Sequence, residues 1–232
     1  MINVKFSEFK KNILEDANDF FSKEGFKFNK GKQLFKKAIG KNYIEYSFDF
    51  LDYFPNWYEY NFGFSISIQE IEKIKKEFND FNKSDKILLN SVFFFEGDFV
   101  EELIGKEYKY RSGHYNKISS TDDIKGSMSR ILYIIREKAL PLSYKFCDLS
   151  SFQEYYLCNK QEVIRNLASE TLFISTLIAA YLKNTSEYVE LSRFLKSELD
   201  IEKSKGSDYK QLYILLDKID QFINHKIGGN VN

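Results

Sequence analysis

The sequence is poor in the residues that mark disulfide-rich, metal-binding and redox proteins. Its 232 residues include only two cysteines, Cys147 and Cys158, and two histidines, His114 and His225. Two cysteines cannot supply a disulfide framework, and no His-x-x-x-His or Cys-x-x-Cys spacing offers a set of zinc ligands. We therefore expect neither a metal nor another cofactor. If both cysteines lie on helices, we interpret them as small buried hydrophobic residues.

The sequence also lacks an excess of charge of either sign. Its 34 Lys and Arg balance 34 Asp and Glu, so the formal net charge is zero. Nucleic-acid-binding proteins usually show a basic excess or a basic stripe. The balanced total therefore argues against a nucleic-acid partner, and nucleic-acid binding through the Lys-rich first helix is the least favoured function.

A long hydrophobic run is missing as well. The longest nearly apolar stretch, residues 171–182, is interrupted by Ser175 and Thr176, and it is shorter than the about 20 residues that span a membrane. The first residues lack the apolar core of a signal peptide. We therefore expect no membrane association and a cytoplasmic location.

Aromatic residues, by contrast, are abundant. They make up 17% of the chain, with 23 Phe and 16 Tyr, and hydrophobic residues reach 43%, which is enough to build a core. Lys, Asn and Ile are also frequent, and the codons of an AT-rich genome favour all of these residues. The aromatic content alone is therefore not a binding signal. The length fits one elaborated domain or two small ones.

The segment from Ser7 to Gly25 predicts an amphipathic helix. Ser7 is the expected N-cap, because its hydroxyl can accept a hydrogen bond from a free amide at the helix start. Gly25 suits the left-handed position that ends a helix. Between them, apolar residues recur at spacings of three and four, which gathers them on one face: Phe9, Ile13, Ala17, Phe20 and Phe21.

Two later segments, residues 44–50 and 60–68, alternate apolar and polar residues with period two. Alternation of this kind predicts strands with one buried and one exposed face. Residues 32–39 form a weaker strand, Gly40-Lys41-Asn42 is a credible hairpin turn, and Pro55-Asn56 separates the second strand from the third. These segments predict an antiparallel meander whose apolar face is covered by the first helix.

The rest of the chain is predicted to be mostly helical. A second amphipathic helix is expected at 71–81, a short edge strand at 92–95 and a long loop at 106–121. Asp122 and Asp123 fit a helix start, and Pro141 is expected to end or kink that helix. Further helices are expected at 149–158, 161–183, 186–200 and 207–225. The predicted fold class is α+β: residues 1–121 form an antiparallel β-meander backed by helices, and residues 122–232 form a C-terminal helical region packed on it.

The order of these elements resembles that of a loose group of uncharacterised bacterial helix–meander–helix proteins. The resemblance is carried by the Gly25-Phe26 turn after the first helix, by the strands at 44–50 and 60–68, and by the Leu140-Pro141 step in a later helix. Some proteins of this group resemble antitoxins or immunity partners of secreted bacterial toxins. The resemblance therefore implies a toxin-binding role, and it assigns no residues to that role.

The distribution of acidic residues provides a candidate binding surface. Residues 42–69 contain acidic residues but no Lys or Arg, whereas the preceding segment is rich in Lys. On the strand pattern, Glu45, Asp49 and Glu59 face away from the core. We therefore predict an acidic outer face that docks a basic protein partner, since complementary charge speeds and orients association.

Two aromatic residues, Trp57 and Tyr58, border this acidic face. Trp and Tyr are common binding anchors, so we include both in the predicted partner-binding surface, although Trp57 fits a buried position equally well. A purely structural role for the acidic residues is the alternative. Charged side chains solvate the exposed face of a sheet and protect strand edges from aggregation.

The loop at 106–121 contains the cluster that most resembles a catalytic site: Arg111, His114 and Tyr115, with Gly113 among them. Arg can bind a phosphate or carboxylate bidentately, and His titrates near neutral pH. The same residue types also occur together in ordinary surface loops, and no catalytic residue is assigned. We therefore predict a non-catalytic protein–protein interaction protein, with an immunity-type inhibitor of a bacterial toxin as its specific role. An enzyme with its site in this loop is the alternative.

Overall fold

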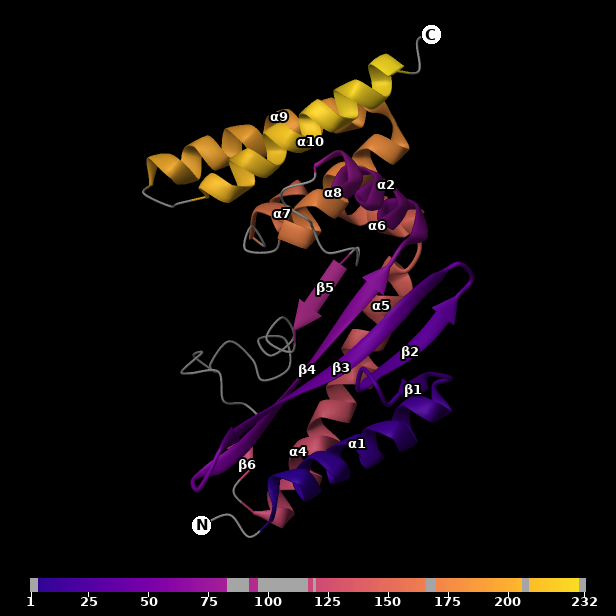
Figure 1. The fold of residues 1–232 in the computed structure, drawn as a ribbon, viewed down its shortest axis with the longest axis vertical. Coiled ribbons are helices and arrows are strands. Elements are labelled where there is room, and N and C mark those ends of the chain that lie inside the picture. The colour runs from indigo at the N-terminus through magenta and orange to yellow at the C-terminus, as the bar shows by residue number, and fades with distance from the viewer. Residues whose placement is uncertain are drawn as a thin grey trace. The chain divides into compact units, whose positions relative to one another are not determined.

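The computed structural model of the chain describes residues 4–82, 92–95, 117–118, 120–165, 170–205 and 209–229. It combines an antiparallel sheet with helices and continues into a helical C-terminal region (Figure 1), which confirms the predicted α+β class. The chain divides into two compact units. The first contains Met1–Ile66 and Phe94–Lys145, and the second contains Ser67–Phe93 and Phe146–Asn232. This division does not establish independent folding, so the predicted domain boundary near residue 121 stays a prediction.

The first unit is built on the sheet. The strands of the sheet are β1 (Lys27–Asn29), β2 (Leu34–Ile39), β3 (Asn42–Tyr53), β4 (Trp57–Ser67), β5 (Val92–Phe95) and β6 (Lys117–Ile118). The spatial order is β1-β2-β3-β4-β5, and β6 pairs with β4. The helices of the first unit are α1 (Phe6–Lys23), α4 (Thr121–Ile134), the π-helix η1 (Ile135–Ala139) and α5 (Leu140–Phe146). The strand predicted at 92–95 is confirmed, and β6 corrects the prediction of a continuous loop at 106–121.

The first helix begins earlier than predicted. Lys5 is the N-cap and makes no side-chain capping hydrogen bond, so the predicted capping role of Ser7 is wrong. The Phe6 ring lies 5.9 Å from the Phe9 ring and 5.1 Å from the Tyr58 ring. This packing extends the helix to include Phe6, because tertiary contacts override a local capping preference worth about 1 kcal/mol.

The end of α1 is as predicted. Gly25 adopts a left-handed φ of 81°. The amides of Gly25 and Phe26 donate to the carbonyl oxygens of Ser22 and Phe21 at 3.1 and 2.9 Å. The rings of Phe21 and Phe26 lie 5.2 Å apart. These paired bonds and this hydrophobic contact are those of a Schellman motif, which satisfies the last helical carbonyls.

Strands β2 and β3 form the predicted tight hairpin. Ile39 pairs with Asn42, which leaves a two-residue turn. Gly40 occupies the first turn position with a φ of 60°, where a type II′ turn requires a positive φ. The resulting register places Lys36 opposite Glu45 and Leu34 opposite Ser47, and β3 continues beyond Ser47 without a partner in β2.

The inner face of the sheet packs against α1 through an aromatic cluster. The Phe21 ring lies 4.7 Å from Phe35 and 4.9 Å from Tyr46, and the Phe9 ring lies 5.2 Å from Tyr58. Aromatic pairs at such distances add about 0.5–1.5 kcal/mol each beyond their area burial. The inward-facing residues of β3 are buried as predicted: Ile44, Tyr46 and Phe48.

Strand β4 is buried on both faces, which the alternating pattern did not predict. Glu59, Ser65 and Ser67 lie opposite the apolar face, yet each is at most 4% exposed. β4 lies inside the sheet, with β3 on one side and β5 and β6 on the other. Alternation assigns side chains to faces and does not show whether a second face is covered. The predicted exposed outer face is therefore correct for Asp49 of β3 and wrong for β4.

The helix that follows residue 120 starts with a capping box. The Ser120 hydroxyl accepts a hydrogen bond from the Asp123 amide at 3.3 Å, and the Asp123 carboxylate accepts one from the Ser120 amide at 2.8 Å. The predicted start near Asp122 is confirmed. The chain stays helical past Pro141, so of the two predicted outcomes, an end or a kink of the helix, the end does not occur. The widened turn η1 lies just before Pro141, and a turn of this kind accommodates a residue that lacks an amide hydrogen.

The second unit is helical and is organised around α8. Its helices are α2 (Gln69–Phe81), α6 (Leu149–Cys158), α7 (Lys160–Arg165), α8 (Glu170–Lys183), α9 (Thr185–Ser204) and α10 (Lys210–Gly229). α8 packs against all five of the others, and its residues 172–180 are buried without interruption. A helix buried on all sides is hydrophobic all round, which explains the apolar stretch in the sequence.

Most helical predictions for the C-terminal region are confirmed with small shifts at the ends. The helix predicted at 161–183 corresponds to α7 and α8, and residues 166–169 lie outside the described residues.

Cys147 is buried, but Cys158 at the end of α6 is exposed, so the interpretation of both cysteines as buried is wrong for Cys158. Within the described ranges, no helix is both long enough and apolar enough to cross a membrane.

Candidate functional site

Of the three carboxylates predicted to form an acidic outer face, the structure leaves only one well exposed to water. The Glu45 carboxylate lies 3.0 Å from the Lys36 ammonium of β2, and only 18% of the Glu45 side chain is exposed. Glu59 is 1% exposed and accepts a hydrogen bond from the Asn61 amide at 3.5 Å, so the prediction that Glu59 faces water is wrong. Asp49 is exposed as predicted. Strand register decides which charges meet across a sheet, and it brings a lysine from outside the acidic segment to Glu45.

The predicted aromatic anchors also have different environments. Tyr58 is 3% exposed, and its hydroxyl donates to the Val4 carbonyl at 3.0 Å. Tyr58 therefore belongs to the core, and its predicted place on a binding surface is wrong, because its position in β4 puts it on the inner face. Trp57 is half-buried, and its ring lies 5.3 Å from the Tyr53 ring. The loop candidates Arg111, His114 and Tyr115 lie outside the described residues.

Exposed apolar residues gather at the far end of the β3–β4 hairpin, which we call the hairpin tip (residues 51–57). Leu51, Tyr53 and Phe54 are exposed there, and Phe54, at 69%, is the most exposed large hydrophobic residue of the described chain. Figure 1 shows β3 and β4 extending together past β2 to reach this tip. Adjacent exposed apolar side chains often mark an interaction site.

The turn within the hairpin tip is held by two hydrogen bonds. The Asp52 carboxylate accepts a hydrogen bond from the Phe54 amide at 2.9 Å, and the Asn56 amide donates to the Tyr53 carbonyl at 3.0 Å. A side chain that accepts a hydrogen bond from the backbone amide two residues later stabilises a turn. The tip therefore presents Phe54 on a backbone that is already ordered, with Asp52 exposed beside it.

Sequence reasoning missed Leu51, Tyr53 and Phe54 as surface residues. A signal was present, because Tyr53 and Phe54 directly precede the predicted turn at Pro55-Asn56. Turns lie on protein surfaces, so aromatic residues beside a turn are exposed unless another segment covers them.

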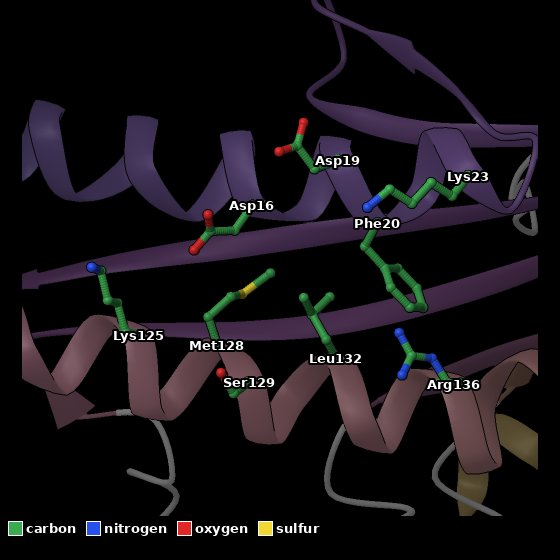
Figure 2. A pocket seen from close by; sticks show the side chains of 9 residues that line it. All are labelled: Asp16, Asp19, Phe20, Lys23, Lys125, Met128, Ser129, Leu132 and Arg136. Carbon is green, nitrogen blue, oxygen red and sulfur yellow. The ribbon is translucent and has the colours of Figure 1, made fainter.

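A groove of about 420 Å³ between α1 and the α4–η1 helix is a second candidate site (Figure 2). Both helices cover the inner face of the sheet. The Tyr60 ring lies 6.0 Å from the Phe9 ring of α1, and its hydroxyl lies 2.9 Å from the Ser127 hydroxyl of α4. Clefts between neighbouring helices are one of the places where ligands bind.

The groove has an apolar floor and charged rims. Phe20 and Met128 on the floor are buried, and Leu132 is partly exposed. The polar side chains that line it are Asp16, Asp19 and Lys23 from α1 and Lys125, Ser129 and Arg136 from α4 and η1. An apolar surface with a few charged groups is the usual composition of a ligand site.

The second unit buries a lysine. Lys75 of α2 is 0% exposed, and its ammonium nitrogen lies 3.5 Å from the Thr171 carbonyl oxygen of α8. Burial lowers the pKa of Lys75 to about 7, and the attraction of Glu72 acts in the opposite direction. Lysines with lowered pKa values can act as nucleophiles. Because this side chain is fully enclosed, a substrate could not reach it in the folded unit, and we interpret Lys75 as structural.

The buried thiol is likewise unsuited to catalysis. Burial raises the pKa of Cys147 to about 11, with a further contribution from the nearby Asp148 carboxylate. A raised pKa keeps the thiol protonated at neutral pH, and the thiolate is the reactive form. Among the described residues, no group of three or more His, Cys, Asp or Glu side chains is placed to hold a metal ion.

Comparisons with models of protein families, with curated proteins and with solved structures give no match to this chain. The hairpin tip and the groove are therefore interpreted from their own residues, geometry and charge.

Proposed function

We propose that the chain acts by binding another protein through the hairpin tip. The observation that carries this proposal is the exposure of Leu51, Tyr53 and Phe54 on a turn already held by hydrogen bonds. Covering apolar side chains stabilises a complex by about 25 cal/mol per Å² of apolar surface removed from water. An ordered turn also reduces the entropy that is lost when two proteins associate.

The charge around the tip supports a basic partner. Asp49 and Asp52 are exposed next to the apolar residues, whereas Glu45 is paired with Lys36 and Glu59 is buried. Exposed carboxylates attract and orient a positively charged protein during approach. The proposed contact is therefore apolar at its centre and acidic at its rim.

As the specific role, we propose an immunity-type inhibitor of a bacterial toxin. The support for this role is the resemblance of the element order to that of such proteins, together with a tip suited to a basic partner. Inhibition by occupying a toxin's surface needs complementary contacts and requires no catalytic group from the inhibitor.

The test is co-expression with the product of the adjacent gene, with bacterial growth and direct binding as the two measurements. Phe54→Ser should weaken binding about tenfold or more, because truncating a central aromatic anchor typically costs about 2 kcal/mol. Asp49→Lys should slow association, and this effect should shrink at high salt, because exposed charges are screened.

Tyr133→Ser is the matched control, because it removes an exposed aromatic side chain from α4 rather than from the tip. It should bind as the wild type does, and circular dichroism should show that all variants are folded. If the wild-type chain neither binds the adjacent gene product nor protects growth, the immunity role is wrong. If folded Phe54→Ser binds and protects normally, the hairpin tip is not the binding surface.

A further inference from the structure

Two positively charged side chains line one end of the groove between α1 and α4, on either side of Phe20 (Figure 2). Lys23 lies in the last turn of α1, and Arg136 lies in η1. Figure 2 shows both side chains reaching toward Phe20, Lys23 from one helix and Arg136 from the other. The Arg136 guanidinium carbon lies 5.3 Å from the centre of the Phe20 ring.

Neither cation has a carboxylate partner within the part of the chain that the structure describes. Asp19 is four residues before Lys23, but Figure 2 shows its carboxylate pointing away from α4. The C-terminal turn of α1 favours a positive charge at Lys23, and the Phe20 ring attracts Arg136. These contacts orient the two cations and leave their charge available to an anion.

The apolar floor adds a second requirement for a ligand. Phe20 and Met128 form a buried surface beside the two cations, and Leu132 continues it. Phe20 and Met128 are already almost fully buried, so Leu132 is the floor residue whose side chain is partly in contact with water. A ligand that places an apolar group against Leu132, in addition to an anion at the cationic end, gains from its burial.

The other end of the groove limits how much negative charge a ligand can carry. Asp16 lies there, across from Lys125 (Figure 2). An extended polyanion running along the groove would meet the Asp16 carboxylate, and like charges repel. The groove therefore suits a ligand with one anionic group at the Lys23–Arg136 end.

We propose that this groove binds a peptide segment of a partner protein, with an Asp or Glu carboxylate at the end that Lys23 and Arg136 line. The adjacent apolar side chain of the peptide lies on the floor formed by Phe20, Met128 and Leu132. This proposal does not rest on the hairpin tip, which we propose binds a basic surface.

The probe is a set of short acetylated and amidated peptides in which Leu and Glu are separated by one, two or three Ala. Each has a matched peptide with Gln in place of Glu. Binding is followed by two-dimensional amide NMR, which reports affinity, location and folding together. At least one Glu peptide should shift the amides of the groove and bind about fivefold or more tightly than its Gln counterpart, because hydrogen bonds to charged groups are the stronger ones.

Variants of the cations test the assignment. Lys23→Gln and Arg136→Gln should each weaken binding of the Glu peptide about 5- to 10-fold and leave the affinity for the Gln peptide nearly unchanged. Lys125→Gln is the matched control at the opposite end and should change affinity less than about twofold, as expected for a solvent-exposed charge. Arg136→Glu should abolish the preference for the Glu peptide over its Gln counterpart, because the remaining Lys23 charge is then offset by the new carboxylate.

Three results would overturn the proposal: equal binding of Glu and Gln peptides, groove amides that no peptide shifts, or a loss in Lys125→Gln as large as in Arg136→Gln. Inorganic pyrophosphate is tested beside the peptides. If it shifts the groove amides more strongly than every peptide, the site is a general anion site and the peptide assignment is wrong. Phe54→Ser should bind the peptides normally, which separates a failure of this proposal from a failure at the hairpin tip.

Discussion

Replacing Lys75 with Met should stabilise the second unit, and it should do so most strongly at low pH. Lys75 is fully buried on α2, and burial lowers its pKa to about 7. Met has a side chain of similar length without a charge, so it keeps the packing and removes the need to desolvate an ammonium group. Replacing buried ionic groups with apolar residues of similar volume often stabilises proteins by about 1–4 kcal/mol.

The size of the pH effect follows from the pKa change. The folded state holds the Lys75 proton less tightly than the unfolded chain, where the pKa is near 10.5. The unfolded state therefore binds more protons between about pH 7 and pH 10.5, and wild-type stability should rise with pH across this window. Integrating this linkage gives a rise of roughly 2–3 kcal/mol between about pH 6 and pH 9. Below about pH 7 the full penalty of burying the charge applies.

The assay is urea unfolding at several pH values between 6 and 9, with far-ultraviolet circular dichroism as the signal. Limiting the range to pH 9 avoids most of the stability change from Cys147, whose pKa is raised from 9.0 to about 11 by folding and which therefore lowers stability mainly between these two pH values. The advantage of Lys75→Met over wild type should be largest at pH 6 and should decrease by about 2–3 kcal/mol by pH 9. Lys76→Met changes the exposed neighbour on the same helix and should alter stability by less than about 0.5 kcal/mol.

An advantage of Lys75→Met that does not change with pH would refute the reasoning, because it would show that the gain comes from packing and not from the charge. A destabilised Lys75→Met variant would also refute it, because the contacts of the ammonium with Thr171 and Glu72 would then outweigh its desolvation. Titration of the Lys75 side-chain carbon signal by NMR would measure the pKa directly and separate these cases.

Three further predictions concern stability in the first unit. Gly25→Ala should destabilise the chain by about 1–2 kcal/mol in thermal or urea unfolding, since its φ of 81° is strained for residues with a Cβ; a neutral result would contradict the Schellman assignment. Gly126→Ala should have the opposite sign and stabilise by about 0.5–1 kcal/mol, because this helical glycine has open space around it. Phe64→Asp and Ser65→Asp should both destabilise by several kcal/mol, since both side chains are buried; a tolerated Ser65→Asp would show that the outer face of β4 is open to water.

Signals that act within a few residues allowed much of the fold to be predicted. The positive φ at Gly25 and Gly40 follows from turns that only a residue without a Cβ adopts easily, and the acidic start of α4 follows from the needs of free helical amides. The period-two pattern of β3 identified its inward face correctly. These features depend on neighbouring residues, so the sequence contains what is needed to predict them.

Features that depend on distant segments could not be predicted in the same way. The burial of Glu59 and Ser65 depends on what lies beside and above β4, which its own alternation does not encode. The groove is lined by Lys23 and Arg136, which are far apart in the sequence and share no motif. The buried Lys75 sits in an amphipathic helix that was predicted correctly, but the pattern of α2 gave no sign that α8 would enclose this position.

The acidic segment shows why a charge count along the sequence is a poor guide to a binding surface. Its carboxylates share one sign and one stretch of chain, yet the fold gives them different environments. Glu45 meets Lys36 because the two-residue turn at Gly40 sets the β2–β3 register, and Glu59 is enclosed because β4 is an inner strand. Only carboxylates near the end of the hairpin remain exposed, where β3 has passed the last residue of β2. The same extension that frees Asp49 from a lysine partner also leaves Phe54 in water. The length by which β3 and β4 exceed β2 is therefore the structural cause of both halves of the proposed contact, its acidic rim and its apolar centre.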